Sequence, residues 1–154
     1  MSESDPIRVF VTHTFDESAD YLRVFEFLES VDRFYYLNVS KPENIPVEAS
    51  PEAIKDELIE QILQAEVVVI VPDVFAQDSG QVLYMMDVAA ANNKAMITVK
   101  PFGGISETSK EVIARVSEEL EWNAREIVDT ITLLARGTET QRWEVIDFPG
   151  LDSE

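Results

Sequence analysis

The sequence predicts a three-layer α/β/α domain around a mostly parallel central sheet. Short apolar runs rich in β-branched residues alternate with longer segments whose apolar residues recur at helical spacing. One run, residues 67–71, is too short for a buried helix and too continuously apolar for a half-exposed strand, so we expect it to be the central strand. Parallel strands joined by helices imply right-handed crossovers and a sheet that helices cover on both faces.

Each element follows from a local signal. Runs of β-branched and aromatic residues between polar or proline-containing segments predict strands, and apolar residues three or four positions apart predict helices. Strands are expected at residues 7–11, 34–39, 67–71 and 96–99, and helices at 17–30, 50–63, 81–92, 106–119 and 123–137.

Capping residues mark the helix boundaries. Ser50 before Pro51 predicts a helix start, because serine accepts hydrogen bonds from free amides and proline is preset for the first turn. Residues 78–80 combine breaker and capping types before the third helix, and Asn123 is expected to cap the last one. Gly137 is the expected end of that last helix.

The length of 154 residues predicts a single domain. We expect residues 1–137 to form this domain and residues 138–154 to be a carboxyl-terminal extension. An apolar group around Trp143 is expected to dock partly on the domain, whereas the acidic last residues are expected to fray.

Composition argues against several classes of partner and site. The chain has 30 acidic and 12 basic residues, a formal net charge of −18, which repels nucleic-acid phosphates and anionic lipid headgroups. It has no cysteine and one histidine, His13, so we expect no metal site. No apolar run approaches the roughly 20 residues of a membrane-spanning helix and no signal peptide is recognisable, so we expect a cytoplasmic protein.

Open sheets of this type bind ligands beyond the carboxyl ends of their strands, which directs attention to residues 12–16. His13 offers an imidazole that either contacts a ligand and exchanges a proton near neutral pH, or packs within a turn. Thr12, Thr14 and Asp16 surround it with hydroxyl and carboxylate groups, but these residue types also cap helices.

Three familiar kinds of site lack their motifs. No glycine-rich phosphate loop follows a strand, and Ser79 before Gly80 lacks the glycine elbow and the second histidine that a nucleophilic serine needs. Asp73 and Lys100 superficially fit a phosphoacceptor site. The acid pair that such a site needs after the first strand is absent.

Five segments carry a resemblance that covers roughly residues 7–132. They are VFVTHTF at 9–15, LNVSKPENIP at 37–46, EVVVIVPDVFAQDSGQVLYMMDVAA at 66–90, KAMITVKPFG at 94–103 and LEWNAREIVDTI at 120–131. In this order and spacing, the sequence resembles the TIR-like family of small prokaryotic domains that includes the Thoeris-type defence proteins. The resemblance implies a flavodoxin-like fold and, in several relatives, cleavage of NAD to nicotinamide and ADP-ribose or a cyclic signal.

The resemblance also implies where the acid of such enzymes lies. Those relatives carry a glutamate on the helix after the central strand, in a pattern similar to W-x-x-Y-E. Here the tyrosine is Tyr84, but Gln81 and Met85 occupy the tryptophan and glutamate positions. A thioether cannot orient a ribose hydroxyl or stabilise an oxocarbenium-like centre as a carboxylate does. Asp87 is a candidate substitute acid, although it points about 200° around the helix axis from Met85.

Two functions follow as hypotheses. The first is a TIR-like signalling or recognition module, in prokaryotic defence or stress signalling, that binds a protein partner and a nucleotide without turnover. The second is an NAD glycohydrolase or cyclase that uses Asp87, Asp16 or Glu43 as its acid. A nucleotide-processing enzyme related to deoxyribosyltransferases would need a nucleophilic glutamate near the helix, and none is found there.

Both hypotheses make NAD a ligand or a substrate, and neither requires a bound cofactor. The resemblance also implies self-association through helix faces, so a homodimer is a further expectation. The residues expected to contact the ligand lie near the carboxyl ends of the strands and are Thr12, His13, Thr14, Phe15, Asp16, Asn38 and Tyr84.

Overall fold

Five parallel strands form the centre of the molecule. The structure, a computed structural model, describes residues 3–104 and 106–146. Its strands are β1 (Ile7–Val11), β2 (Tyr36–Asn38), β3 (Val67–Ile70), β4 (Ala95–Val99) and β5 (Glu118–Leu120). They pair in the order β2-β1-β3-β4-β5, and every neighbouring pair is parallel. This is the strand order of flavodoxin-like folds, so the predicted fold class is confirmed.

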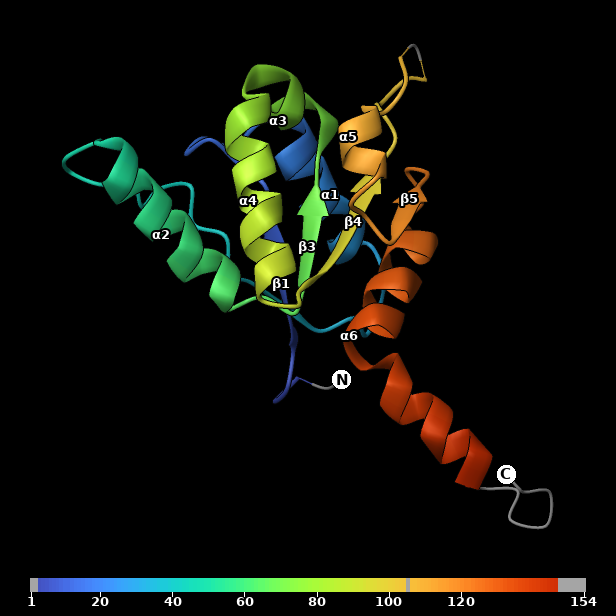
Figure 1. The fold of residues 1–154 in the computed structure, drawn as a ribbon. Helices are drawn as coiled ribbons and strands as arrows, with labels where there is room; N and C mark the ends of the chain where they lie inside the picture. Colours follow the sequence, from blue (N-terminus) through green and yellow to red (C-terminus); the bar gives the residue numbers. More distant parts are fainter. Residues whose placement is uncertain (1–2, 105, 147–154) are drawn as a thin grey trace.

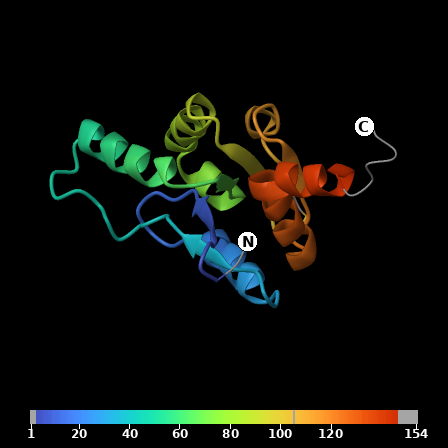
Figure 2. The same cartoon turned by 90° about the horizontal axis from the view of Figure 1, so that it is seen from below.

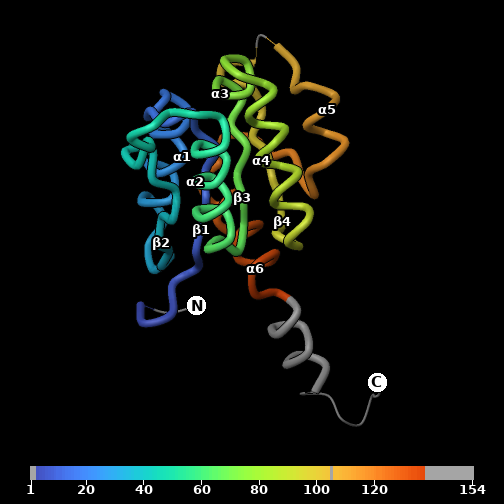
Figure 3. The backbone as a smooth tube through the Cα atoms, turned by 60° about the vertical axis from the view of Figure 1, so that its left-hand side comes forward, coloured from blue at the N-terminus to red at the C-terminus, as the bar shows by residue number. Residues whose placement is uncertain are grey.

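Helices cover both faces of the sheet. They are α1 (Ala19–Glu29), α2 (Pro51–Leu63), α3 (Pro72–Gln77), α4 (Ser79–Ala91), α5 (Lys110–Ile113) and α6 (Ala124–Ile146). The helices α2 and α4 lie on one face, and α1 and α6 lie on the other (Figure 1, Figure 2). Figure 3 shows α2 and α4 running side by side over β1 and β3.

The strands differ in burial, and the most deeply buried strand has the clearest apolar run in the sequence. β3 is buried along its whole length, as its uninterrupted apolar run predicts. β2 is an edge strand and none of its residues is fully buried. Val9 of β1 is paired with Asn38 on one side and with Val67 on the other. The carboxyl ends of β1 and β3 therefore lie next to each other in the middle of the sheet.

The predicted helix starts at Ser50 and Asn123 are confirmed. The Ser50 hydroxyl accepts a hydrogen bond of 3.2 Å from the Ala53 amide, and Pro51 occupies the first turn. The Asn123 side chain accepts a hydrogen bond of 2.9 Å from the Glu126 amide. Both caps satisfy amides that have no partner within the helix.

The helix predicted over residues 106–119 is wrong. Only Lys110–Ile113 is helical there, and Glu118–Leu120 forms the edge strand β5 beside β4. The strand contains no β-branched residue, and only Leu120 is buried. Pairing with β4, rather than local propensity, therefore determines this element.

Two other helix boundaries differ from the prediction. The short helix α3 begins directly after β3 with Pro72 in its first turn, where no helix was expected. At the other end of the chain, α6 continues through Gly137 to Ile146, so the predicted stop at this glycine is wrong. A glycine inside a helix costs about 1 kcal/mol relative to alanine, which the rest of a long helix can offset. The predicted docking of the Trp143 side chain and the last residues, 147–154, lie outside what the structure describes.

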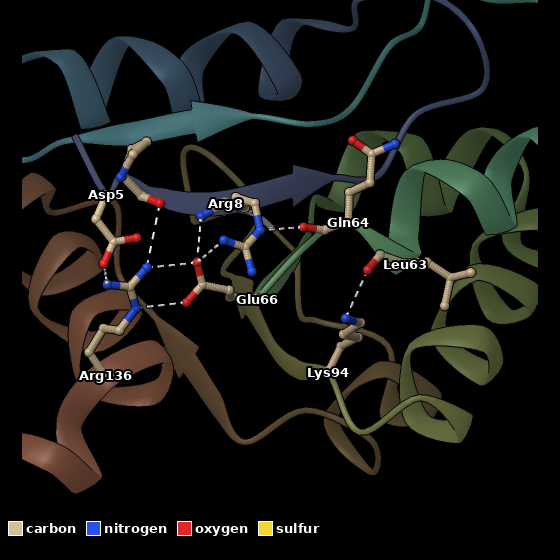
Figure 4. A network of polar contacts seen from close by, with 8 residues as sticks. Asp5, Arg8, Leu63, Gln64, Glu66, Lys94 and Arg136 are labelled. Atoms are coloured by element: carbon tan, nitrogen blue, oxygen red, sulfur yellow. Dashed lines mark hydrogen bonds and ion pairs between the residues drawn. The ribbon is translucent and has the colours of Figure 1, made fainter. Parts of the chain in front are cut away.

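An ion-pair network closes the amino end of the sheet and ties α6 to β1 and β3. Arg136 donates hydrogen bonds of 2.8 and 2.9 Å to the two carboxylate oxygens of Glu66 (Figure 4). The same guanidinium contacts Asp5 at 3.1 Å, and the Arg8 amide donates to Glu66 at 3.0 Å. Burial alone would raise the pKa of Glu66, but these hydrogen bonds and the arginine charges lower it.

Candidate functional site

The first turns of α1 and α3 face each other where the carboxyl ends of β1 and β3 meet. Asp20 lies in the first turn of α1, and its carboxylate accepts a hydrogen bond of 3.1 Å from the Asp73 amide. Asp73 lies in the first turn of α3, and its carboxylate accepts one of 2.9 Å from the Asp20 amide. Each acid therefore satisfies the free amide of the other helix, because amides in a first turn have no partner within their own helix.

Two further contacts hold this reciprocal tie. The Ser18 hydroxyl donates a hydrogen bond of 2.9 Å to Asp73 and also caps α1 by accepting from the Tyr21 amide. Arg23, one turn further along α1, donates to the Asp20 carboxylate. Burial raises the pKa of Asp20, and the nearby Asp73 carboxylate raises it further, while the hydrogen bonds from the Asp73 amide and Arg23 oppose the shift.

A cavity of about 510 Å³ opens beside this tie, above the carboxyl ends of β3 and β4. Asp20, Arg23 and Asp73 form one side of it. Thr98, at the end of β4, lies at its base, fully buried, and donates a hydrogen bond of 2.8 Å to the Ile70 carbonyl. The volume is in the range of roughly 300–1,000 Å³ that small-molecule sites occupy.

Aromatic side chains fix the orientation of Arg23 in this cavity. The guanidinium carbon lies 3.8 Å from the centroid of the Phe102 ring and 5.4 Å from that of Trp122. The Arg23 side chain is 25% exposed. The N–H bonds of a guanidinium lie in its own plane, so a guanidinium that lies over an aromatic ring can still donate hydrogen bonds at its edges.

Most of the residues predicted for the site lie elsewhere, around His13. This side chain is fully buried. Its Nδ1 accepts a hydrogen bond of 3.0 Å from the Phe15 amide, so Nε2 carries the proton and donates to the Gln61 side chain at 2.9 Å. Burial lowers the pKa of His13, and the hydrogen bond to Gln61 opposes the shift. This histidine holds the loop after β1 against α2.

The neighbours of His13 are also engaged within the protein. Thr12 is buried, and its hydroxyl accepts a hydrogen bond of 3.1 Å from the Val71 amide. The Thr14 hydroxyl donates to Asp16 at 3.1 Å. Phe15 adopts a positive φ of 65°, which turns the chain sharply, and its ring lies 5.0 Å from the imidazole centroid.

Asn38 belongs to the same cluster as His13 through Tyr21. The Asn38 amide donates a hydrogen bond of 3.1 Å to the Tyr21 hydroxyl, and its carbonyl accepts one of 2.9 Å from the Ser40 amide. The Tyr21 ring lies 6.3 Å from the His13 ring. Tyr21 therefore links Asn38 to His13 within a packed network.

Tyr84 is separated from that network and lines a second cavity of about 410 Å³ between α2 and α4. Lys55 of α2 lies 5.2 Å from the centroid of the tyrosine ring. Asp78, which also lines this cavity, caps α4 by accepting a hydrogen bond of 3.1 Å from the Gln81 amide. None of the other predicted ligand residues lines either this cavity or the one beside Asp20, so the predicted residues do not form one site.

The two positions that the resemblance singled out on α4 have contrasting environments. Met85 is fully buried in the core. Asp87 is 68% exposed and forms an ion pair of 2.8 Å with Arg115. Asp87 therefore lies on the outer surface of α4, as its position in the helix predicts, and outside both cavities.

The phosphoacceptor pair noted in the sequence is not assembled either. Asp73 is committed to Ser18 and Asp20, and Lys100 pairs with Glu121 at 2.5 Å. In the part of the chain that the structure describes, no three histidine or acidic side chains gather closely enough to hold a metal ion. No helix among these residues is both long and apolar enough to cross a membrane.

Sequence reasoning missed Asp20 and Arg23. The available signal was a serine followed two positions later by an acid just after the first strand, which is a typical helix start. Nothing in the sequence indicates that this acid accepts a hydrogen bond from the first turn of a second helix. The cavity itself depends on the loop after β4 and on α5, and that region is where the prediction of secondary structure was wrong.

Comparisons with known proteins do not identify a family for this chain. No family model matches the chain, and no curated protein matches it. Among solved structures, the type II dehydroquinase from Propionibacterium acnes is similar with a TM-score of 0.44 and 14% sequence identity. That alignment covers 84% of this chain and 97% of the dehydroquinase chain.

Proposed function

We propose that this chain is a TIR-like recognition domain of the cytoplasm that binds a protein partner, and a nucleotide as ligand, without cleaving NAD. The observation that carries the proposal is the burial of Met85. At the position where related enzymes carry their acid, this chain has a thioether with no exposed surface. The position supplies neither a carboxylate nor access to a substrate.

The other carboxylates named for the enzyme hypothesis do not compensate. Asp87 pairs with Arg115 on the outer surface of α4, and Asp16 is hydrogen-bonded to Thr14 in the loop after β1. Glu43 is exposed in the loop before α2. None of these three acids lines the cavity beside Tyr84, so none is in reach of a nucleotide bound there.

The loop between β2 and α2 supports the recognition part of the proposal. Ile45 and Val47 are apolar and strongly exposed there, and Ala49 at its end lines the cavity beside Tyr84. Exposed apolar side chains beside a cavity are typical of surfaces that bind other molecules. A partner that covers this loop would therefore also sense whether the cavity is occupied.

One observation favours the second function, NAD cleavage by a non-standard acid. Asp78 lines the same cavity as Tyr84 and Lys55. Its carboxylate uses one oxygen to cap α4 and retains acceptor capacity on the other. Asp78, rather than Asp87, is therefore the acid to test.

The deciding experiment is incubation of the purified chain with NAD, with nicotinamide release followed by chromatography. We expect no nicotinamide from the natural sequence, from Asp78→Asn or from Asp87→Asn. Asparagine caps a helix about as well as aspartate, so Asp78→Asn removes the charge without removing the cap. Nicotinamide release that Asp78→Asn abolishes and Asp87→Asn leaves intact would replace the proposal with the enzyme hypothesis.

Binding is tested separately by adding NAD to isotope-labelled protein and following amide resonances. Shifts confined to the region around Tyr84 are expected, and Lys55→Met should weaken them. Restoring the family's acid by Met85→Glu is a poor test, because an unpaired carboxylate in the core costs several kcal/mol and unfolds a marginal domain.

A further inference from the structure

We propose that the cavity above β3 and β4 binds a small zwitterion, a free amino acid with an apolar side chain. Arg23 would bind its carboxylate, the pair Asp20 and Asp73 its ammonium group, and Phe75 and Phe102 its side chain. The inference is independent of the TIR-like function, because this cavity shares no residue with the one beside Tyr84.

Arg23 supplies the first part of the argument. Among the described residues, Arg23 donates one hydrogen bond, to Asp20. A guanidinium has several further N–H donors. The ring of Phe102, 3.8 Å from the guanidinium carbon, fixes the plane of these donors. The side chain is 25% exposed and lines the cavity, so its free donors are available to a ligand bound there. A carboxylate matches two parallel guanidinium N–H groups better than other small acceptors do.

The acids supply the second part. Asp20 and Asp73 each accept two hydrogen bonds within the protein, and an ionised carboxylate can accept about four. Glu107 also lines the cavity, so its walls carry more acid than base. An ammonium group would therefore be attracted to the side of the cavity formed by α1 and α3.

Together the charges select the class of ligand. A phosphate, with its two negative charges, would meet Arg23 but also three acids, and a simple cation would meet an arginine already in place. A zwitterion satisfies both signs and adds no net charge to a chain that already carries −18. The α-amino and α-carboxylate groups of an amino acid lie on one carbon, just as Arg23 and Asp20 lie side by side on α1.

The remaining walls are suited to an apolar side chain. Ile70 and Val112 are almost fully buried and line the cavity, as do the partly buried Phe75 and the more exposed Phe102. The Thr98 hydroxyl donates to a backbone carbonyl and can still accept one hydrogen bond at the base. A volume of about 510 Å³ accommodates an amino acid as large as phenylalanine.

The test uses L-phenylalanine and two matched analogues that each lack one charged group. 3-Phenylpropanoate lacks the ammonium group, and 2-phenylethylamine lacks the carboxylate. Each is titrated into isotope-labelled protein while the amide resonances near Asp20, Asp73 and Thr98 are followed. We expect L-phenylalanine to bind at least about tenfold more tightly than either analogue, which corresponds to about 1.4 kcal/mol.

Two variants in which phenylalanine replaces an alanine test whether the cavity is the binding site. Ala76→Phe places a ring in the cavity from the exposed end of α3 and should abolish binding. Ala90→Phe makes the same change at an exposed position of α4 outside the cavity and should leave binding unchanged. Arg23→Gln should weaken L-phenylalanine about tenfold while leaving the weaker 2-phenylethylamine unaffected.

Three results would overturn the inference. Absence of resonance shifts at about 10 mM L-phenylalanine would show that the cavity does not bind this class. Equal affinity for 2-phenylethylamine would indicate a simple cation site, and equal affinity for 3-phenylpropanoate would indicate a simple anion site. None of these results would bear on NAD, because the NAD experiment follows the cavity beside Tyr84.

Discussion

Glu66 and Asp20 are carboxylates with little exposed surface at opposite ends of the same sheet, and they are held by different kinds of partner. At the amino end, the two oxygens of Glu66 face the guanidinium of Arg136, with Arg8 close by. At the carboxyl end, Asp20 and Asp73 face each other's helix amides, and Arg23 pairs with Asp20. The pKa of Glu66 is lowered, whereas that of Asp20 is raised.

The difference shows how one sheet separates a structural end from an open one. Two arginines pair with Glu66 and neutralise its charge, so this carboxylate is engaged within the protein. Helix amides carry partial charges only, so Asp20 and Asp73 retain negative charge beside a cavity. The carboxyl end is thus where a ligand would gain most, in agreement with the general position of ligands in parallel sheets.

The largest effect is expected from breaking the amino-end network with Arg136→Met. Methionine keeps the apolar stem but leaves the carboxylate of Glu66, 15% exposed, without its bidentate partner. We expect a loss of about 1 to 3 kcal/mol in the free energy of unfolding, measured with urea. The control is Arg125→Met, which removes an exposed pair of 3.8 Å with Asp129 and should cost less than about 0.5 kcal/mol. Equal losses in both variants would contradict the assignment of Arg136 as a structural partner.

An intermediate effect is expected at the carboxyl end from Asp73→Asn. The amide can replace only one of the two acceptors that Asp73 offers to Ser18 and the Asp20 amide, so we expect a loss of about 1 to 2 kcal/mol. Asp78→Asn, where a single oxygen caps the aspartate's own helix, should change stability by less than about 0.5 kcal/mol. If the two variants are equally stable, the tie between α1 and α3 has no energetic role.

The smallest effect, and the sharpest comparison, is in the sign of the pH dependence. Because the folded pKa of Glu66 is below its ordinary value of 4.5, its contribution is present above that pH and is lost as the pH falls through the folded pKa. The folded pKa of Asp20 is above 3.8, so ionising it costs stability, and that cost disappears on acidification. From about pH 7 to about pH 3, the free energy of unfolding of the natural chain should fall relative to that of Glu66→Gln. Over the same range it should rise relative to that of Asp20→Asn. The measurement is the difference in melting temperature between the natural chain and each variant at each pH. If the two differences change in the same direction on acidification, the comparison is contradicted.

The sequence predicted the fold well where a strand is buried on both faces. The continuous apolar run of β3 and the Ser50 cap of α2 carry their signals locally, and both were identified correctly. β5 could not be identified in this way, because its residues are ordinary helix formers and only pairing with β4 makes them a strand. Gly137 was misleading for a similar reason, since glycine ends many helices but is also tolerated inside a long one.

The site was harder to predict because its parts act across the chain. His13 was expected to contact a ligand, but nothing local reveals that Gln61, 48 positions from His13, takes up its hydrogen bond. Asp20 and Asp73 are 53 positions apart, and each is an ordinary first-turn acid in the sequence. Only the adjacency of β1 and β3 brings them together.

The guanidinium of Arg136 also joins the beginning of the chain to its last helix. Its contact with Asp5 spans 131 positions, so forming it early in folding would require closing almost the whole chain into one loop. We therefore expect this contact to form late, after the sheet has assembled. Substitution of Arg136 should then speed unfolding more than it slows folding, so that Arg136 would govern the lifetime of the folded molecule.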